Sequence, residues 1–160
     1  MVVIICTGTP GTGKTFISTK IARILKFDYL YVGDVVKEFK LGSGKDRRLN
    51  SVEVDPKKLN KIIIKLIKNY DNVIIDGHLS QYLPSKYVDL CLVTKCDLKV
   101  LKKRLEMKRY SRIKVRENLD AEIFDVCLVE ALENKHNTMI VDTSKKVDLS
   151  KLVRLIRRKI

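Results

Sequence analysis

Eight residues near the start of the chain, Gly8-Thr-Pro-Gly-Thr-Gly-Lys14-Thr15, have the types and spacing needed to bind a polyphosphate. Glycines let consecutive backbone N–H groups turn toward an anion, because no Cβ blocks the necessary conformations. Lys14 brings a positive charge to the β and γ phosphates, and the Thr15 hydroxyl is a ligand for a bridging magnesium ion. The apolar run from Val2 to Cys6 precedes this loop as a buried strand would. We therefore predict a site for a nucleoside triphosphate rather than a glycine-rich turn that binds nothing.

A second chemical motif, Val73-Ile-Ile-Asp76-Gly-His78, is an apolar run that ends in an acid and has the form of a Walker B element. In a parallel sheet the carboxyl ends of the strands face one crevice, so Asp76 is expected beside Lys14 and Thr15. A carboxylate there orients the ion and waters next to the phosphates. Taken alone, Asp76 fits an ordinary turn residue equally well. His78 either positions a water molecule or a substrate phosphate, or is only a turn residue.

The net charge of +14 is the second unusual feature of the chain. Between Lys99 and Arg116 nine basic residues accompany the single acid Glu106, and the C-terminal segment interleaves basic with apolar residues as a basic amphipathic helix would. Such a surface attracts polyanions, and a surface that merely carries solvated lysines has the same composition. A polyanionic partner beyond the nucleotide and a solvated basic surface are therefore equal alternatives.

Apolar strand-like runs alternate with helical patterns, which predicts a parallel sheet covered by helices on both faces. The expected strands are residues 2–7, 29–32, 73–76, 88–94 and 138–142. The expected helices are residues 14–25, 56–69, 98–108, 118–133 and 149–158. Asp55 before Pro56 and Asp97 before Leu98 have the positions of helix N-caps. Residues 41–51 are expected to form a mobile surface segment.

The length of 160 residues suits one domain, residues 1–160, with a single core. Neither a membrane-spanning run nor a signal-peptide pattern is visible, so a cytoplasmic protein with no membrane partner is expected. The four cysteines are Cys6, Cys91, Cys96 and Cys127. They are scattered singly, without C-x-x-C spacing or neighbouring histidines, and are expected to be small core residues.

In their order along the chain, the motifs resemble those of adenylate-kinase-like P-loop NTPases of the isoenzyme 6 type. The segments that carry the resemblance are the loop GTPGTGKT, Tyr31-Val-Gly-Asp34-Val-Val-Lys37-Glu38, Ile75-Asp-Gly-His78, Leu101-Lys-Lys-Arg104-Leu-Glu106, Lys108-Arg-Tyr110 and Glu117-Asn118. The likeness covers residues 2–145, and the D-x-H ending distinguishes this family from ordinary adenylate kinases. It implies an α/β, three-layer nucleoside monophosphate kinase fold with a five-stranded parallel sheet. It also implies a monophosphate-binding segment at residues 31–54 and a short lid at residues 108–118.

The resemblance further implies roles for individual residues. The positions that would hold ATP are Gly11, Gly13, Lys14, Thr15, Phe16, Arg109 and Lys145, of which Lys145 would lie against the adenine. Asp76 and His78 match the pair tied to magnesium and ATP turnover, with Asp76 acting on the ion through water. Asp34 and Lys37 match the acceptor site.

Two positions leave alternatives open. A forked guanidinium that closes over the transferred phosphoryl group would stabilise its charge, and Arg109 matches that lid arginine, although Arg104 and Arg112 are alternatives from the sequence. Lys37 stands where relatives commonly carry an arginine, so acceptor binding is either weak or passes to Arg47 or Arg48. The stretch around these last two residues is basic here and can be strongly acidic in relatives.

Two functions of different class follow from the resemblance. The first is transfer of the γ-phosphoryl group of Mg-ATP to AMP, accompanied by ATP hydrolysis, with a lid that excludes water. The second is an ATPase assembly factor in maturation of the small ribosomal subunit, with a ribosomal protein and 16S ribosomal RNA as partners, acting as a monomer or in a transient complex. The basic segments fit both functions. A kinase for a small non-nucleotide metabolite is a third alternative, since P-loop folds accept many substrates.

Overall fold

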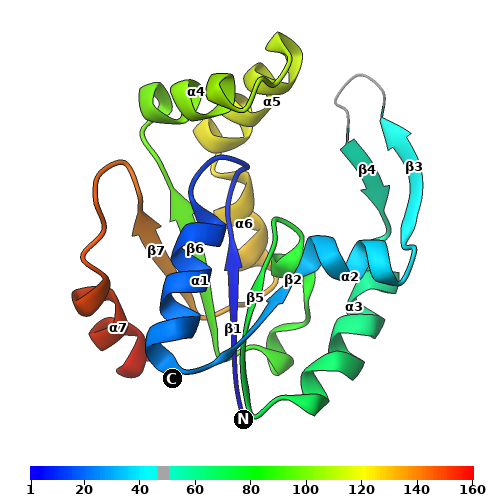
Figure 1. Cartoon of the computed structure of the whole chain (residues 1–160), viewed down its shortest axis with the longest axis vertical. Coiled ribbons are helices and arrows are strands. Elements are labelled where there is room, and N and C mark those ends of the chain that lie inside the picture. Colours follow the sequence, from blue (N-terminus) through cyan, green and yellow to red (C-terminus); the bar gives the residue numbers. More distant parts are fainter. Residues whose placement is uncertain (47–50) are drawn as a thin grey trace.

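Five parallel strands form the central sheet of the computed structural model, which describes residues 1–46 and 51–160. The strands are arranged in the order β2-β5-β1-β6-β7, and every neighbouring pair is parallel (Figure 1). Their bounds are β1 Val2–Thr7, β2 Asp28–Tyr31, β5 Asn72–Asp76, β6 Leu90–Lys95 and β7 Thr138–Asp142. Because all five run in one direction, their carboxyl ends meet at a single edge, where the loops that follow β1 and β5 lie.

Helices cover both faces of this sheet (Figure 1). In the described residues they are α1 Lys14–Leu25, α2 Val32–Glu38, α3 Pro56–Leu66, α4 Leu98–Met107, α5 Arg112–Ile123, α6 Val126–Glu133 and α7 Leu149–Arg157. Three short 3₁₀ turns are η1 Ile67–Asn69, η2 Ser80–Tyr82 and η3 Ser85–Tyr87. The result is the three-layer α/β arrangement that the sequence predicts, and that prediction is confirmed.

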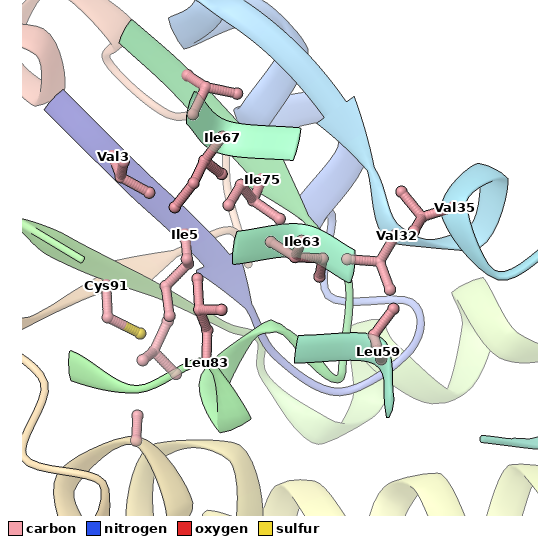
Figure 2. Packing of buried hydrophobic residues seen from close by; sticks show 13 residues of the cluster. Val3, Ile5, Val32, Val35, Leu59, Ile63, Ile67, Ile75, Leu83 and Cys91 are labelled. Carbon is pink, nitrogen blue, oxygen red and sulfur yellow. The ribbon is translucent and has the colours of Figure 1, made fainter. Parts of the chain in front are cut away.

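The strands read as continuous apolar runs because their alternate side chains enter two different cores. Ile4 of β1 packs in a cluster with α1 and α7, whereas Ile5 packs in a cluster with α2, α3 and α6. Figure 2 shows the cluster that contains Ile5, in which Ile63 of α3 lies beside Ile75 of β5 and Leu59 of α3 lies near Val32 of α2. The two clusters hold the central strands, and hence their carboxyl ends, in fixed positions.

Two parts of the chain extend beyond the carboxyl edge of the sheet. The helices α4 and α5 share a small core of their own, built on Leu101, Leu105 and Val115. On the other side stands an antiparallel hairpin of β3 (Gly42–Asp46) and β4 (Ser51–Val54) (Figure 1). Both parts lie above the loops that carry the predicted chemistry.

Two expectations about local structure are wrong. Residues 41–51 are not a loose segment throughout, because β3 and β4 pair there; Arg47 and Arg48 lie outside the described residues. The single helix expected over 118–133 is two helices, since Asp125 between them adopts φ 53°. The first of these helices also begins earlier, at Arg112, where the hydroxyl of Ser111 caps it by accepting a hydrogen bond from Lys114 N.

The cysteines are free, and three of them are buried, which agrees with their predicted place in the core. Within residues 1–46 and 51–160, no helix combines the length and the apolar character needed to cross a bilayer.

Replacement of Ile75 by alanine tests the importance of the core beneath the site. Ile75 is fully buried in β5, so its truncation leaves a cavity and should lower the free energy of unfolding by about 2–5 kcal/mol. Ile24→Ala is the matched control, because Ile24 is 44% exposed on α1 and its loss should cost less than about 1 kcal/mol. Urea denaturation of both variants measures the difference, and equal losses would contradict the packing described.

Candidate active site

The phosphate-binding loop links β1 to α1 and depends on glycine for its shape. Gly8 has φ 145°, and a Cβ at this position would lie 2.6 Å from the carbonyl oxygen of Thr94. Gly13 has φ 87° and precedes the first residue of α1, so the helix begins at Lys14. This geometry turns the loop around the N-terminus of α1, where free N–H groups and the helix dipole favour an anion.

The Lys14 ammonium is folded onto this loop. Its Nζ donates hydrogen bonds to the carbonyl oxygens of Gly8 at 2.8 Å and Thr9 at 3.1 Å. Burial lowers the pKa of Lys14, while the nearby Cys127 thiol and Asp76 act in the opposite direction. A phosphate group supplies negatively charged acceptors in place of neutral carbonyls, so an incoming triphosphate offers this amine stronger hydrogen bonds.

Asp76 is fully buried at the end of β5 and is bonded on one oxygen only. Its Oδ2 accepts hydrogen bonds from the hydroxyl of Thr15 at 2.6 Å and from that of Tyr29 at 2.7 Å. Its Oδ1 is buried and has no hydrogen-bond partner among the described residues. Burial and the bond to Asp76 both raise the pKa of Tyr29, so this phenol remains a donor at neutral pH. The carboxylate therefore holds Thr15 and retains one free acceptor.

A cavity of about 900 Å³ opens beside the loop. Its walls come from three parts of the chain: the phosphate loop with α1, the helix α4, and the connection from β7 to α7. The predicted ATP-binding residues that line it are Gly11, Gly13, Lys14, Thr15, Phe16 and Lys145. Six of the seven residues assigned to ATP from the sequence are thus brought together around one hollow.

The seventh, Arg109, does not line this cavity. It is exposed on the turn between α4 and α5, where it adopts φ 56°. Arg104 of α4 lines the cavity instead, and its guanidinium donates to the carbonyl oxygen of Thr143 at 2.6 Å and to the Thr143 hydroxyl at 3.1 Å. Of the three arginines that the sequence left open, Arg104 is the one at the cavity in this structure, and contact of Arg109 with phosphate stays a prediction.

The predicted acceptor residues lie elsewhere. Asp34 and Lys37 are exposed on α2, outside the walls of the cavity. His78 follows Asp76 by two residues and keeps part of its surface exposed. Burial of its ring lowers the pKa of His78, and the positive charges of Lys14 and Lys114 lower it further. Both effects favour the neutral form of the His78 ring.

The sequence did not predict several residues of the site. Tyr29 precedes Asp34 by five residues in an unremarkable strand, and only the register of β2 against β5 brings its hydroxyl to Asp76. Thr143 follows the last strand, and its hydroxyl donates to the carbonyl oxygen of Thr12 at 2.6 Å. Glu122 is a buried acid of α5 that accepts a hydrogen bond from Thr9 in the loop. The helical spacing in the sequence does point to Glu122. It lies seven residues after Val115, which is buried, and therefore on the same inner face of α5.

The loop, the buried acid and the sheet order define the class: a P-loop protein with a kinase-like α/β fold. A family model described as an AAA domain matches residues 4–125. The structure of shikimate kinase from Bacteroides thetaiotaomicron superposes with a TM-score of 0.60 over 98% of this chain and 97% of that chain. The two sequences are 17% identical, so this likeness concerns the fold alone.

Closer relatives narrow the class. A Thermococcus kodakarensis protein named "Putative adenylate kinase" is 38% identical over 98% of this chain and 86% of that protein. An "Adenylate kinase isoenzyme 6 homolog" from Schizosaccharomyces pombe is also 38% identical, over 88% of this chain and 79% of that protein. The chain belongs to the adenylate-kinase-like P-loop family of the isoenzyme 6 type.

Replacement of Tyr29 by phenylalanine tests the support of Asp76. The change removes one of the two donors to Oδ2, so the carboxylate holds its orientation less firmly, and the Mg²⁺ concentration for half-maximal activity should rise by about tenfold. Tyr31→Phe is the control: burial and then the nearby charge of Asp76 raise the pKa of Tyr31, but Tyr31 is not a donor to that carboxylate. A Mg²⁺ titration of turnover that is the same for Tyr29→Phe and the wild type would show that Tyr29 has no such role.

Proposed function

We propose that the protein transfers the γ-phosphoryl group of Mg-ATP to AMP. The observation that carries this proposal is the joint position of the Lys14 loop, the half-bonded carboxylate of Asp76 and the adjoining cavity. Membership of the adenylate-kinase-like family supports the reaction class. The identity of the acceptor rests on the sequence resemblance, and the cytoplasmic location rests on the sequence patterns considered above; both remain predictions.

The residues that line the cavity suggest where the triphosphate and the base of ATP would lie. The triphosphate would lie over the N-terminus of α1, where Lys14 and the loop N–H groups point. The base would then lie against Phe16 and Lys145, which also line the cavity. The apolar ring of Phe16 and the aliphatic stem of Lys145 suit a flat base.

The residues present also fit a magnesium ion. Thr15 offers a hydroxyl oxygen, and the unpartnered Oδ1 of buried Asp76 is an acceptor for a water molecule of the ion. When bound there, Mg²⁺ would supply positive charge that neutralises the charge developing on the phosphates during transfer. Asp76 would then keep its bond from Tyr29 and hold Thr15 in place.

The acceptor would enter from the side of α2 and the β3–β4 hairpin. Asp34 and Lys37 are exposed there, on the side of the sheet that holds β2 and β5 (Figure 1). The helices α4 and α5 stand on the opposite side of the loop, so movement of both parts toward each other would exclude water from the transferred group. The exposed Arg109 would reach the phosphates only in such a closed state.

Turnover with and without AMP tests the proposal. ADP formation from ATP should depend strongly on AMP, and Lys14→Ala should lower it by about 100-fold or more because the charge at the transferred phosphate is lost. Arg23→Ala is the control, since Arg23 is exposed on the outer surface of the same helix. Unchanged turnover in Lys14→Ala would overturn the phosphate-site assignment. ADP formation that does not respond to AMP or to other monophosphates would overturn the kinase.

A second candidate is an ATPase that assists assembly of the small ribosomal subunit, and one observation favours it. Six basic residues on two helices are exposed, namely Lys99, Lys102 and Lys103 on α4 and Lys151, Arg154 and Arg157 on α7. Figure 1 shows α4 above the carboxyl edge of the sheet and α7 beside its lower half, so these are two basic surfaces rather than one. Either surface suits a polyanion such as ribosomal RNA.

RNA binding at increasing salt tests the second candidate. If the two helices bind phosphates, the affinity for 16S ribosomal RNA fragments should fall steeply between 50 and 200 mM salt, by roughly 10³-fold or more for six contacts. Added RNA should also stimulate slow ATP hydrolysis, and His78→Ala should lower hydrolysis more than ATP binding. A flat salt dependence, with hydrolysis indifferent to RNA and to His78, would identify the basic residues as a solvated surface.

A further inference from the structure

The proposed reaction leaves one buried charge unexplained. Glu122 lies near the C-terminal end of α5 and is 6% exposed, and it and Asp76 are the buried acids among the described residues. A carboxylate removed from water is costly unless hydrogen bonds compensate it. The partners of Glu122 therefore show why an acid is tolerated there.

The two oxygens of Glu122 bond to two separate parts of the site. Oε2 accepts a hydrogen bond from the hydroxyl of Thr9, in the phosphate loop, at 2.7 Å. Oε1 accepts from the backbone N–H of Cys96, directly after β6, at 3.0 Å. Cys96 stands just before Asp97, the N-cap of α4, and its sulfur accepts a hydrogen bond from Arg104 at 3.3 Å. One carboxylate thus joins α5, the phosphate loop and the start of α4.

Thr9 connects Glu122 to the loop lysine. Its side chain is bonded to Glu122, while its carbonyl oxygen accepts from Lys14 Nζ at 3.1 Å and from the hydroxyl of Thr12 at 2.7 Å. Thr9 is 1% exposed, so no bulk water is available to replace its partner. The position of Glu122 therefore fixes the residue against which the Lys14 ammonium rests.

Within α5, the hydrogen bonds of Glu122 to the phosphate loop and to Cys96 lie near the C-terminal end. Val115 is the other buried residue of this helix, and the residues of its first turn, such as Arg112 and Ile113, are exposed. The polar anchor thus lies at one end of the helix, and the opposite end borders the turn that carries Arg109. Rotation about the Glu122 end would move that turn while the bond to Thr9 is kept.

We propose that Glu122 is a positioning residue that couples the helices α4 and α5 to the phosphate loop through Thr9. Glu122 touches neither nucleotide nor metal; it sets the conformation of Thr9 and so the place of the Lys14 ammonium during transfer. Occupation of the loop by a nucleotide is in turn transmitted to α5. The effect on turnover rests on the proposed phosphoryl transfer, whereas the effect of nucleotide binding on α5 does not.

A pair of substitutions at Thr9 provides the test. Thr9→Val removes the hydroxyl and keeps the shape, so kcat should fall about tenfold, as expected for a displaced catalytic group, with the KM for ATP within about twofold. Thr9→Ser keeps the hydroxyl and should restore kcat to within about twofold of the wild type. Glu122→Met should lower kcat at least as much as Thr9→Val, because it also removes the acceptor of the Cys96 N–H. The double variant should be no slower than Glu122→Met alone, because the Thr9–Glu122 hydrogen bond is already lost in Glu122→Met.

Amide hydrogen exchange in α5 distinguishes the proposed coupling from a purely structural role of Glu122, which would not make exchange depend on the nucleotide. A non-hydrolysable ATP analogue should slow amide exchange in residues 112–123 of the wild type and of Thr9→Ser, but not of Thr9→Val, although Thr9→Val still binds the analogue. Glu133→Gln, an exposed acid of α6, is the control and should behave as the wild type in all assays. The hydrogen-exchange measurement needs no phosphoryl acceptor, so it tests the role of Glu122 even if AMP is not the substrate.

Three results would overturn the inference. The first is equal loss of kcat in Thr9→Val and Thr9→Ser, and the second is a lowered Tm of Thr9→Val with normal kcat. The third is protection of α5 by the analogue in Thr9→Val to the same extent as in the wild type. If Glu122→Met fails to fold, the two Thr9 variants carry the test alone, because both retain the buried carboxylate.

Discussion

The hydrogen bond from Thr15 to the buried carboxylate of Asp76 joins the first turn of α1 to the end of β5. It sets the distance between the two elements that must act on the same phosphates. The bond is possible because β1 and β5 are adjacent and in register, with Cys6 opposite Asp76, so the loop after β1 opens directly beside this acid. The apolar cores on both faces of the sheet hold that register, and the chemistry above the sheet therefore depends on packing below it.

Burial of charged groups is the second constraint on the site. Asp76 and Glu122 lie where water is excluded, and Lys14 is half-buried at the wall of the cavity. Each of the three is compensated by hydrogen bonds rather than by a close ion pair with another of the three. Low local polarity strengthens these bonds and makes any unpartnered atom costly. The free Oδ1 of Asp76 is such an atom, and a hydrated magnesium ion beside the phosphates would satisfy it.

The sequence predicted the class of fold and the meeting of the glycine loop with Asp76, because both depend on local patterns. The glycine loop and the apolar run that ends in Asp76 are contiguous in sequence, and parallel strands bring them together. Tyr29, Thr143 and Glu122 escaped, since their partners lie 47, 131 and 113 residues away and depend on strand register or helix packing. The sequence did not predict the β3–β4 hairpin, because its first strand, Gly42–Asp46, lacks an apolar alternation. It did not predict the helix break at Asp125, because the apolar pattern continues across that residue.

The destination of the phosphoryl group is the central claim of this account. A reaction with γ-labelled ATP and unlabelled AMP, separated by thin-layer chromatography at early times, follows that group directly. The account predicts that most of the label appears in ADP and that the label in inorganic phosphate stays low while AMP is present. Label that is released as inorganic phosphate at the same rate with and without AMP would contradict it.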